Sequence, residues 1–167
     1  VALGNLYFSD EGCADYNSLM HVTPVYRSQQ DRQALLQGVN DGYLSICSNH
    51  RPHELAAKMA PFAATDAGIS VLDSFAGAIF NLVNTGKLTL AAAIGALTSL
   101  PARAIDQTTG QLQPEGRADL CIVDMEQVCE LNAEDLASKG HNNPWLGEQL
   151  MGKVTCTING GHIVYRA

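Results

Sequence analysis

The sequence predicts an α/β fold in which the last part of an α/β barrel is followed by the strands of a small separate sheet. A buried β-prone run lies between helical patterns, as in a repeating α/β unit. A long irregular stretch follows that run, and beyond Pro101 the pattern becomes β-prone up to the end of the chain. We expect residues 1–106 to form the barrel part and residues 107–167 to form the small sheet.

The first fifty residues contain one helical pattern and two β-prone segments. Residues 1–20 predict a short strand and a polar connection. Ser28 is a favourable N-cap and Gly42 a favourable stop, so a helix is predicted between them. Residues 43–48 ("YLSICS") have the apolar, β-prone character of a buried strand. The apolar positions of the helix are Leu35, Leu36 and Val39.

Residues 52–70 form an irregular stretch that is longer than a plain connection requires. Loops at the carboxyl ends of strands carry the chemistry of α/β enzymes, so this stretch is a candidate site. Two helices are predicted after it, at residues 71–86 and 89–100, the second capped by Thr89. The apolar face of the first comprises Leu72, Phe75, Ile79, Leu82 and Val83.

The last third of the chain predicts strands. Residues 110–126 predict a turn and a strand, and Asn159-Gly160-Gly161 predicts the turn of a terminal hairpin. Asp119 and Asp124 flank the first strand, so we expect them to face solvent or cap turns rather than to act as acid and base.

Asn142-Asn143-Pro144-Trp145 predicts a turn that packs Trp145 against the small sheet. A ligand-binding role for this turn is the alternative interpretation.

Composition excludes some partners. Ten basic residues are scattered singly among seventeen acidic ones, for a formal net charge of -7, which disfavours nucleic acid. No run reaches the roughly 20 apolar residues that span a bilayer, so no membrane segment is expected. Cys47, Cys121 and Cys156 lie in apolar or β-rich runs without any C-x-x-C pair, which indicates buried, reduced thiols in a cytoplasmic protein. Because the chain begins at Val1 with neither methionine nor leader pattern, we expect it to be a piece of a longer protein.

The stretch "SICSNHRPHE" at residues 45–54 is the most distinctive motif. His50 and His53 could suggest a metal site, but Pro52 excludes a regular helix that would put both on one face. Adjacent residues of an extended chain point to opposite sides, so Ser48 is not a nucleophile signal. From the residues alone, a polar loop is the favoured interpretation.

In order and spacing, a set of motifs along the chain resembles the carboxyl-terminal portion of a dihydroorotase of the amidohydrolase superfamily. The resemblance covers nearly the whole chain. The motifs are "YNSLMHVTPVYRSQQDRQALLQGVNDG", "SICSNHRPHE", "KMAPFAATDAGISVLD", "LTSLPARAI", "GQLQPEGRADLCIVD" and "SKGHNNPWLGEQLMGKVTCTINGGHIVY".

The resemblance implies a (β/α)8 barrel with its active site at the carboxyl ends of the strands, and a small β-sandwich. Members of the family interconvert N-carbamoyl-L-aspartate and L-dihydroorotate in pyrimidine biosynthesis. Their zinc ions hold and activate a hydroxide that attacks the ring amide. In their D-H-x-P-H motif the aspartate shuttles the proton and the final histidine helps to hold the substrate.

Transferred to this chain, the resemblance makes His53 the substrate-holding histidine and puts Asn49 in the place of the aspartate. A neutral amide cannot accept and return a proton near pH 7 as a carboxylate can. The family's N-P-P-L-R run is here Thr23-Pro24-Val25-Tyr26-Arg27, so Thr23 replaces an asparagine that contacts substrate. Ala67 and Gly68 lie where the family's backbone groups meet the substrate. These four substrate-binding positions are therefore expected to be vestigial or weak.

The metal-binding residues of the family belong to its amino-terminal half. This chain offers only His21, His141 and His162 besides the motif, far apart and in different kinds of segment. We therefore expect it to bind no metal or other cofactor, although active family members use zinc.

Two functional hypotheses follow from these departures. The first is a segment of a working dihydroorotase or related cyclic amidohydrolase in which Asn49 is natural or engineered. The second, favoured because Asn49 and Thr23 depart independently, is a non-catalytic dihydroorotase-like protein that assembles with aspartate transcarbamoylase. A partial barrel would also expose an edge strand, so we expect a homo-oligomer as a further or alternative assembly.

Overall fold

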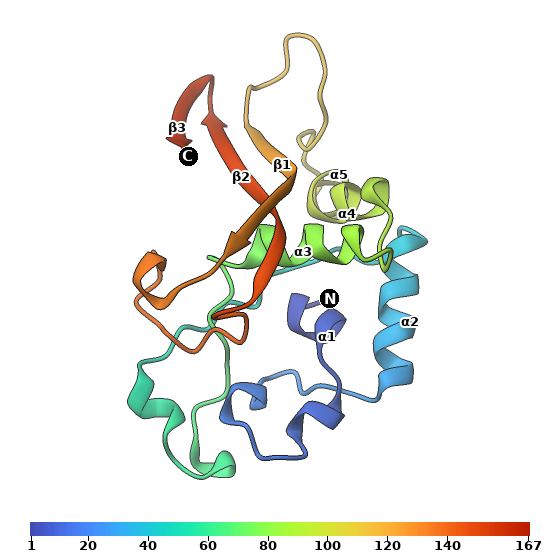
Figure 1. Ribbon diagram of the computed structural model, residues 1–167. Helices are drawn as coiled ribbons and strands as arrows, with labels where there is room; N and C mark the ends of the chain where they lie inside the picture. The colour runs from blue at the N-terminus through green and yellow to red at the C-terminus, as the bar shows by residue number, and fades with distance from the viewer.

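The computed structural model describes residues 1–167 and combines helices with a small antiparallel sheet (Figure 1). In the first half of the chain, three short extended segments run parallel to one another. Isolated parallel bridges join Ala2 to Cys47 and His50 to Ile69. The predicted strand at 43–48 is therefore wrong as a continuous strand. Its Ile46 N–H donates to the Ala96 carbonyl of a helix at 3.0 Å, which leaves that group unavailable for a ladder with the neighbouring segments.

Five α-helices surround these segments, together with several short 3-10 turns. The α-helices are α1 (Leu3–Tyr7), α2 (Gln29–Asn40), α3 (Phe75–Asn84), α4 (Leu90–Leu97) and α5 (Ser99–Ala104). The 3-10 turns are η1 (Asp10–Cys13), η2 (Ser18–Met20), η3 (Leu55–Lys58), η4 (Phe62–Ala64) and η5 (Ala133–Asp135).

Helix α1 occupies residues for which the sequence predicts a strand. Leu3 and Leu6 are both fully buried, and residues three apart share a face of a helix but lie on opposite faces of a strand. The common burial of these two side chains therefore favours the helix. The strand prediction at residues 1–20 is wrong beyond the single bridge of Ala2.

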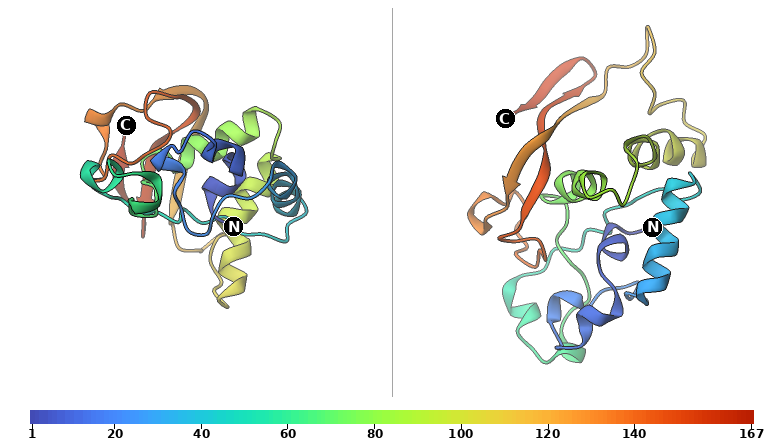
Figure 2. Two further views of the ribbon diagram at one scale, coloured as in Figure 1. Left: turned by 90° about the horizontal axis from the view of Figure 1, so that it is seen from below. Right: turned by 45° about the vertical axis from the view of Figure 1, so that its right-hand side comes forward.

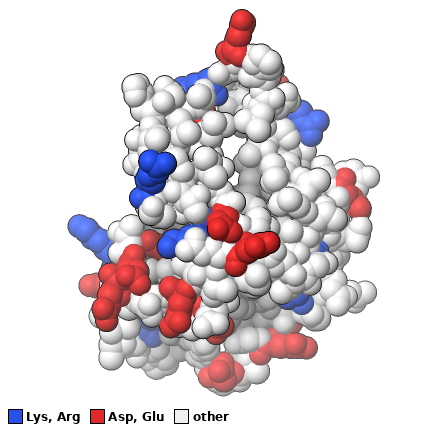
Figure 3. All heavy atoms as spheres, turned by 45° about the horizontal axis from the view of Figure 1, so that its top comes forward, with Lys and Arg blue, Asp and Glu red and all other residues white.

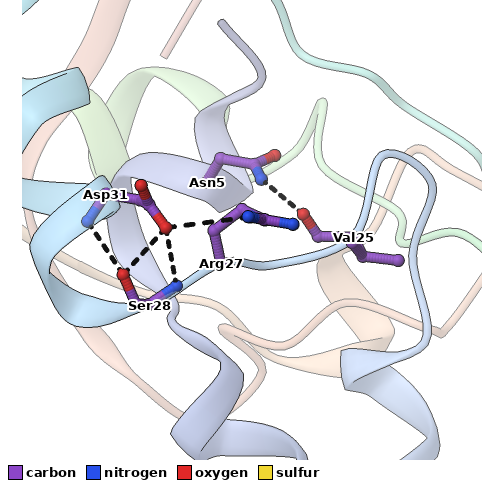
Figure 4. A network of polar contacts seen from close by, with 5 residues as sticks. All are labelled: Asn5, Val25, Arg27, Ser28 and Asp31. Carbon is purple, nitrogen blue, oxygen red and sulfur yellow. Dashed lines mark hydrogen bonds and ion pairs between the residues drawn. The ribbon is translucent and has the colours of Figure 1, made fainter.

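The helix predicted after Ser28 is confirmed as α2, and a reciprocal capping box fixes its start (Figure 4). The Ser28 hydroxyl oxygen accepts from the Asp31 N–H at 3.2 Å, and the Asp31 carboxylate accepts from the Ser28 N–H at 3.2 Å. Arg27 lies 3.7 Å from the same carboxylate in an exposed ion pair. Beside this network, Asn5 of α1 donates to the Val25 carbonyl at 3.1 Å.

The helices predicted at 71–86 and 89–100 are confirmed with different limits. Thr89 caps α4 by accepting from the Ala92 N–H at 3.2 Å. Helix α3 begins only at Phe75, and Leu72, assigned to its apolar face, is 58% exposed because it precedes the helix. Helix α5, which contains Pro101 near its start, was not predicted.

The small sheet has three antiparallel strands in the order β1-β2-β3. They are β1 (Leu120–Glu130), β2 (Gln149–Asn159) and β3 (His162–Arg166). The predicted hairpin is confirmed, with Gly160 and Gly161 at φ 56° and 84° between β2 and β3. The sheet packs on α3 through β2. Its β3 end projects beyond the helices both in Figure 1 and in the right-hand view of Figure 2.

Asp119 and Asp124 accept hydrogen bonds from backbone N–H groups of the sheet, which agrees with the turn-capping role that the sequence predicts. Asp119 accepts from the Gly160 N–H of the hairpin turn at 2.7 Å. Asp124 accepts from the Glu126 N–H at 3.0 Å, where the register of β1 against β2 shifts. Both carboxylates therefore stabilise turns and bulges.

One apolar core joins residues on both sides of position 106. Trp145 is 2% exposed, and its ring centroid lies 5.2 Å from that of Tyr7 and 5.3 Å from that of Phe8. These aromatic neighbours belong to the first residues of the chain and were not predicted. Leu150 of β2 lies in the same core, and the packing of Trp145 on the small sheet stays a prediction. The division at residue 106 stays a prediction.

The expected burial of the cysteines is wrong at all three positions. Cys47 and Cys121 are exposed, Cys156 is only partly buried, and all five thiols are free. Ile46 is buried and Cys47 is exposed because successive residues of an extended segment face opposite sides. The face in Figure 3 carries several groups of acidic side chains and only scattered basic ones. None of the helices has the length and apolar character needed to cross a membrane.

Candidate functional site

Asn49 lies between Cys47 and His50, the two bridged residues of the second extended segment, and has a left-handed backbone conformation with φ 49°. Asparagine and aspartate tolerate this conformation better than most residues. The Asn49 side chain donates from Nδ2 to the Thr23 carbonyl at 3.0 Å. The structure thus brings together the two positions at which the motifs depart from the family pattern, through a bond that requires an N–H donor at residue 49.

Little space remains beside Asn49. The cavity there has a volume of about 10 Å³, room for a single water molecule at most. The Tyr26 hydroxyl on its wall is buried and has no hydrogen-bond partner. The lining residues are Ala2, Gly4, Asn5, Val22, Tyr26, Ser48, Asn49 and Ile69.

His53, Ala67 and Gly68 form a second group. His53 Nε2 lies 3.2 Å from the Ala67 carbonyl oxygen, and because that oxygen can only accept, Nε2 carries the proton. Gly68 has φ 145°, and a Cβ there would lie 2.5 Å from Cβ of Arg51 and 3.1 Å from His53 Nε2. Glycine at position 68 is therefore required by both the backbone and the closeness of the histidine.

The two groups are connected through the backbone around His50. The Arg51 N–H donates to the Ile69 carbonyl at 2.8 Å. His50 Nδ1 accepts from the Val71 N–H at 3.0 Å and from the Leu72 N–H at 3.3 Å, so this nitrogen is unprotonated. His50 is thus a structural link, as the polar-loop interpretation expects.

Asn142 connects the segments of both groups, a role that its turn motif does not predict. Its side chain is 3% exposed, accepts from the His53 N–H at 2.8 Å, and donates to the Arg51 and Gly68 carbonyls at 3.0 and 3.1 Å. The only sequence signal was the Asn-Asn-Pro turn, which ordinarily indicates an exposed segment. Nothing in that pattern identifies partners some ninety residues away.

Lys58 was also missed. It is 7% exposed, and its ammonium group donates to the carbonyls of Ser18, His21 and Asp66 at 3.1, 3.3 and 2.6 Å. Burial lowers the pKa of Lys58, because it disfavours the charged form, while the nearby Asp66 carboxylate opposes that shift. The His21 carbonyl also accepts from the Gly68 N–H at 2.9 Å, so Lys58 and Gly68 share an acceptor and Lys58 helps to hold the loop around Gly68.

The residues of this chain do not by themselves fit a zinc ion. No group of three or more His, Cys, Asp or Glu side chains converges on one point. His21 Nδ1 lies 2.8 Å from the Thr65 hydroxyl, and both His50 and His53 contact backbone groups. These histidine nitrogens therefore make contacts within the protein and do not form a set of metal ligands.

Comparisons with known proteins point to one group of relatives. The chain is 39% identical over 166 residues to a dihydroorotase-like protein of Pseudomonas aeruginosa, and 38% identical over 166 residues to one of Pseudomonas putida. It is 33% identical over 163 residues to a dihydroorotase of Syntrophus aciditrophicus. The match to the Pseudomonas aeruginosa protein covers 99% of this chain but 39% of that relative, so the chain spans well under half of the relative's length. No protein-family model matches the chain.

Solved structures give the fold. The L-hydantoinase (dihydropyrimidinase) of Arthrobacter aurescens superposes with a TM-score of 0.88 at 22% identity, covering 99% of this chain and 38% of that one. The dihydroorotase of Saccharomyces cerevisiae in complex with 5-fluoroorotic acid gives a TM-score of 0.74 at 16% identity, covering 92% of this chain and 42% of that one. The chain therefore has the fold of the carboxyl-terminal part of these amidohydrolases.

Proposed function

The chain belongs to the family of dihydroorotases and dihydroorotase-like proteins, whose carboxyl-terminal part it matches, and we propose that it comes from a non-catalytic member. In this proposal the parallel segments belong to a (β/α)8 barrel and the antiparallel strands to a small β-sandwich. The proposal also places the protein in the cytoplasm, in pyrimidine biosynthesis, where it supports assembly of aspartate transcarbamoylase.

The observation that supports the proposal most directly is the hydrogen bond from Asn49 Nδ2 to the Thr23 carbonyl. An ionised aspartate has no proton to donate and would place its charge against that carbonyl oxygen. Asn49 is thus used as a structural donor in a place where a proton shuttle would need a free carboxylate.

A direct test measures dihydroorotate hydrolysis by the full-length protein loaded with zinc. We expect no turnover above the uncatalysed rate for the wild-type protein, and none for Asn49→Asp, because the new carboxylate would face the Thr23 carbonyl oxygen. Strong hydrolysis by the wild-type protein, or by the Asn49→Asp variant, would contradict the proposal.

Asn17→Asp is a matched control for that experiment. Asn17 undergoes the same amide-to-acid change at an exposed site, but it uses only its acceptor oxygen, which receives the Leu19 N–H at 3.0 Å. The control variant is expected to fold and behave as the wild type. Any activity that appears in Asn49→Asp and not in Asn17→Asp is then due to the carboxylate at position 49.

The partner is tested separately by mixing the full-length protein with aspartate transcarbamoylase at micromolar concentrations and separating complexes by size. A shared peak is expected. Independent elution of the two proteins would remove the assembly role and leave the absence of catalysis to be judged from the hydrolysis assay.

The second candidate is an active, zinc-dependent dihydroorotase or related cyclic amidohydrolase. It is favoured by the group formed from His53, Ala67 and Gly68, which keeps the histidine and the small residue of the family's substrate loop in contact. Several relatives named dihydroorotase also match nearly the whole chain. Turnover by the wild-type protein would favour this candidate.

A further inference from the structure

We propose that Asn142 is a positioning residue that holds the loop segment of His53 against the segment of Gly68. The proposal deepens the one above and rests on it in one respect, since His53 and Gly68 are taken as the ligand-facing residues of the family site. It does not depend on whether the protein turns over substrate.

The first reason is the distribution of hydrogen bonds around the Asn142 side chain. Its oxygen accepts from the His53 N–H at 2.8 Å, while its amide donates to Arg51 at 3.0 Å and to Gly68 at 3.1 Å. The first two contacts hold residues 51–53, and the third holds the segment that continues into Ile69. A single side chain therefore satisfies backbone groups on both segments.

The second reason is that these segments have little regular structure of their own. Only one backbone bridge, between His50 and Ile69, joins them. The Ser70 N–H adds a bond to the Asn142 carbonyl at 2.9 Å, so the main chain of Asn142 contributes as well. In place of a β-ladder, the buried asparagine supplies most of the remaining connections, and buried polar groups left without partners are costly.

The consequence for the site concerns the His53 ring. The distance from His53 Nε2 to the Ala67 carbonyl is 3.2 Å, and it depends on the backbone of both segments. When Asn142 is shortened, its three side-chain bonds disappear together. Apart from the His53 ring itself, the two segments are then held only by the bond from the Arg51 N–H to the Ile69 carbonyl and by the His50 ring. The histidine then loses its fixed orientation and tautomer.

The neighbouring Asn143 provides a matched control. It is 1% exposed, slightly less than Asn142. Its side chain accepts from the Trp145 N–H at 2.9 Å and donates to the Ser74 hydroxyl at 3.2 Å, with no hydrogen bond to residues 51–53 or 68–70. A buried asparagine with a purely structural role is therefore available next in sequence.

The experiment compares Asn142→Ala and Asn143→Ala in the full-length protein by hydrogen exchange at residue resolution and by ¹⁵N NMR of the histidine rings. We expect exchange of the His53 amide to accelerate about tenfold in Asn142→Ala, as for the loss of one hydrogen bond of about 1.4 kcal/mol. The His53 ring signal is expected to change from the Nε2–H tautomer to a mixture. Asn143→Ala should leave both readouts unchanged, whatever its effect on melting temperature.

Equal changes at His53 in both variants would overturn the proposal, as would no change in Asn142→Ala. If Asn142→Ala does not fold, the wild-type protein still decides: the His53 amide must exchange more slowly than that of Glu54, which has no comparable acceptor. Equal exchange at these two amides would also overturn it. Neither readout requires ligand or turnover, so catalysis by the wild-type protein would sink the non-catalytic proposal without affecting this one.

Discussion

At the residue scale, Tyr26 is one of two side chains, with Trp145, that have a buried polar atom without a hydrogen-bond partner. It is 5% exposed, and its hydroxyl has no hydrogen-bond partner. Burial raises the pKa of Tyr26, and the nearby Cys13 thiol contributes in the same direction. The hydroxyl fits only because residue 4 is glycine, since a Cβ there would lie 2.7 Å from it. The tyrosine therefore incurs a desolvation cost without a compensating bond.

Tyr26→Phe is expected to increase the free energy of unfolding by about 1 kcal/mol, because it removes a buried hydroxyl that lacks a partner. Urea unfolding measures the change. Tyr7→Phe is the control: the Tyr7 hydroxyl donates to the Ala78 carbonyl at 2.7 Å and accepts from Asn81 at 3.1 Å, so its removal should be destabilising. Destabilisation of similar size in both variants would show that the Tyr26 hydroxyl has a partner.

At the scale of single elements, α2 shows how a local signal fixes a helix. The capping box satisfies N–H groups at both Ser28 and Asp31, and the hydroxyl of Ser28 also donates to the carboxylate at 2.8 Å (Figure 4). The hydrogen bond from the Ser28 side chain holds the pKa of Asp31 below its ordinary value of 3.8. Desolvation opposes this shift, and the Ser28 backbone and Arg27 make smaller contributions that also lower the pKa. The cap thus depends on the ionised form of Asp31.

The lowered pKa of Asp31 predicts an acid-sensitive cap. The folded chain binds fewer protons than the unfolded chain near pH 3.8, so the stabilisation is present above that pH and is lost as pH falls through the folded pKa. Asp31→Asn should therefore flatten the loss of stability on acidification, measured by urea unfolding at a series of pH values. The exposed Glu115→Gln change is the control, and an equal flattening there would contradict the assignment to the cap.

Ser28→Ala removes the other half of the same cap. The variant is expected to lower the free energy of unfolding by about 1 kcal/mol at neutral pH, the usual cost of losing an N-cap hydroxyl. Thermal and urea unfolding both measure it. A neutral effect at pH 7 would show that the remaining tertiary contacts of α2 fix its start without the cap.

At the scale of the whole molecule, each edge strand of the sheet has one side that pairs with no other strand. The order β1-β2-β3 places β1 and β3 at the edges, and all residues of β3 are exposed. The apolar side chains Ile163, Val164 and Tyr165 are 58%, 61% and 47% exposed. An exposed, apolar edge strand favours pairing with another chain.

Self-association of this chain through β3 is expected and should weaken when a charge is placed on the strand. Val164→Lys should shift sedimentation velocity profiles toward the monomer at a given concentration, because edge lysines oppose strand pairing. Leu112→Lys makes the same kind of change at an apolar residue that is 87% exposed but outside the sheet. If both variants shift the profile equally, association does not use β3.

Local signals made part of the fold predictable, and long-range contacts limited the rest. The caps at Ser28 and Thr89 and the hairpin turn each depend on residues a few positions apart, and all are found as expected. Helix α1 was missed because the burial of its leucines is decided by distant parts of the chain. In the candidate site, the motif brought His53 and Asn49 to attention, whereas Asn142 acts across 89 residues to reach His53 and has no local pattern.

The bond between Asn49 and Thr23 also bears on evolutionary reversibility. The loop now uses the amide proton of residue 49 to hold the carbonyl of residue 23, in a backbone conformation that either asparagine or aspartate tolerates. Exchanging the amide for a carboxylate keeps the shape but removes the donor, so the reverse substitution meets an obstacle that other parts of the loop would have to relieve. In a lineage that carries this contact, a change to aspartate costs the loop about 1 kcal/mol unless a second substitution supplies another donor for the Thr23 carbonyl.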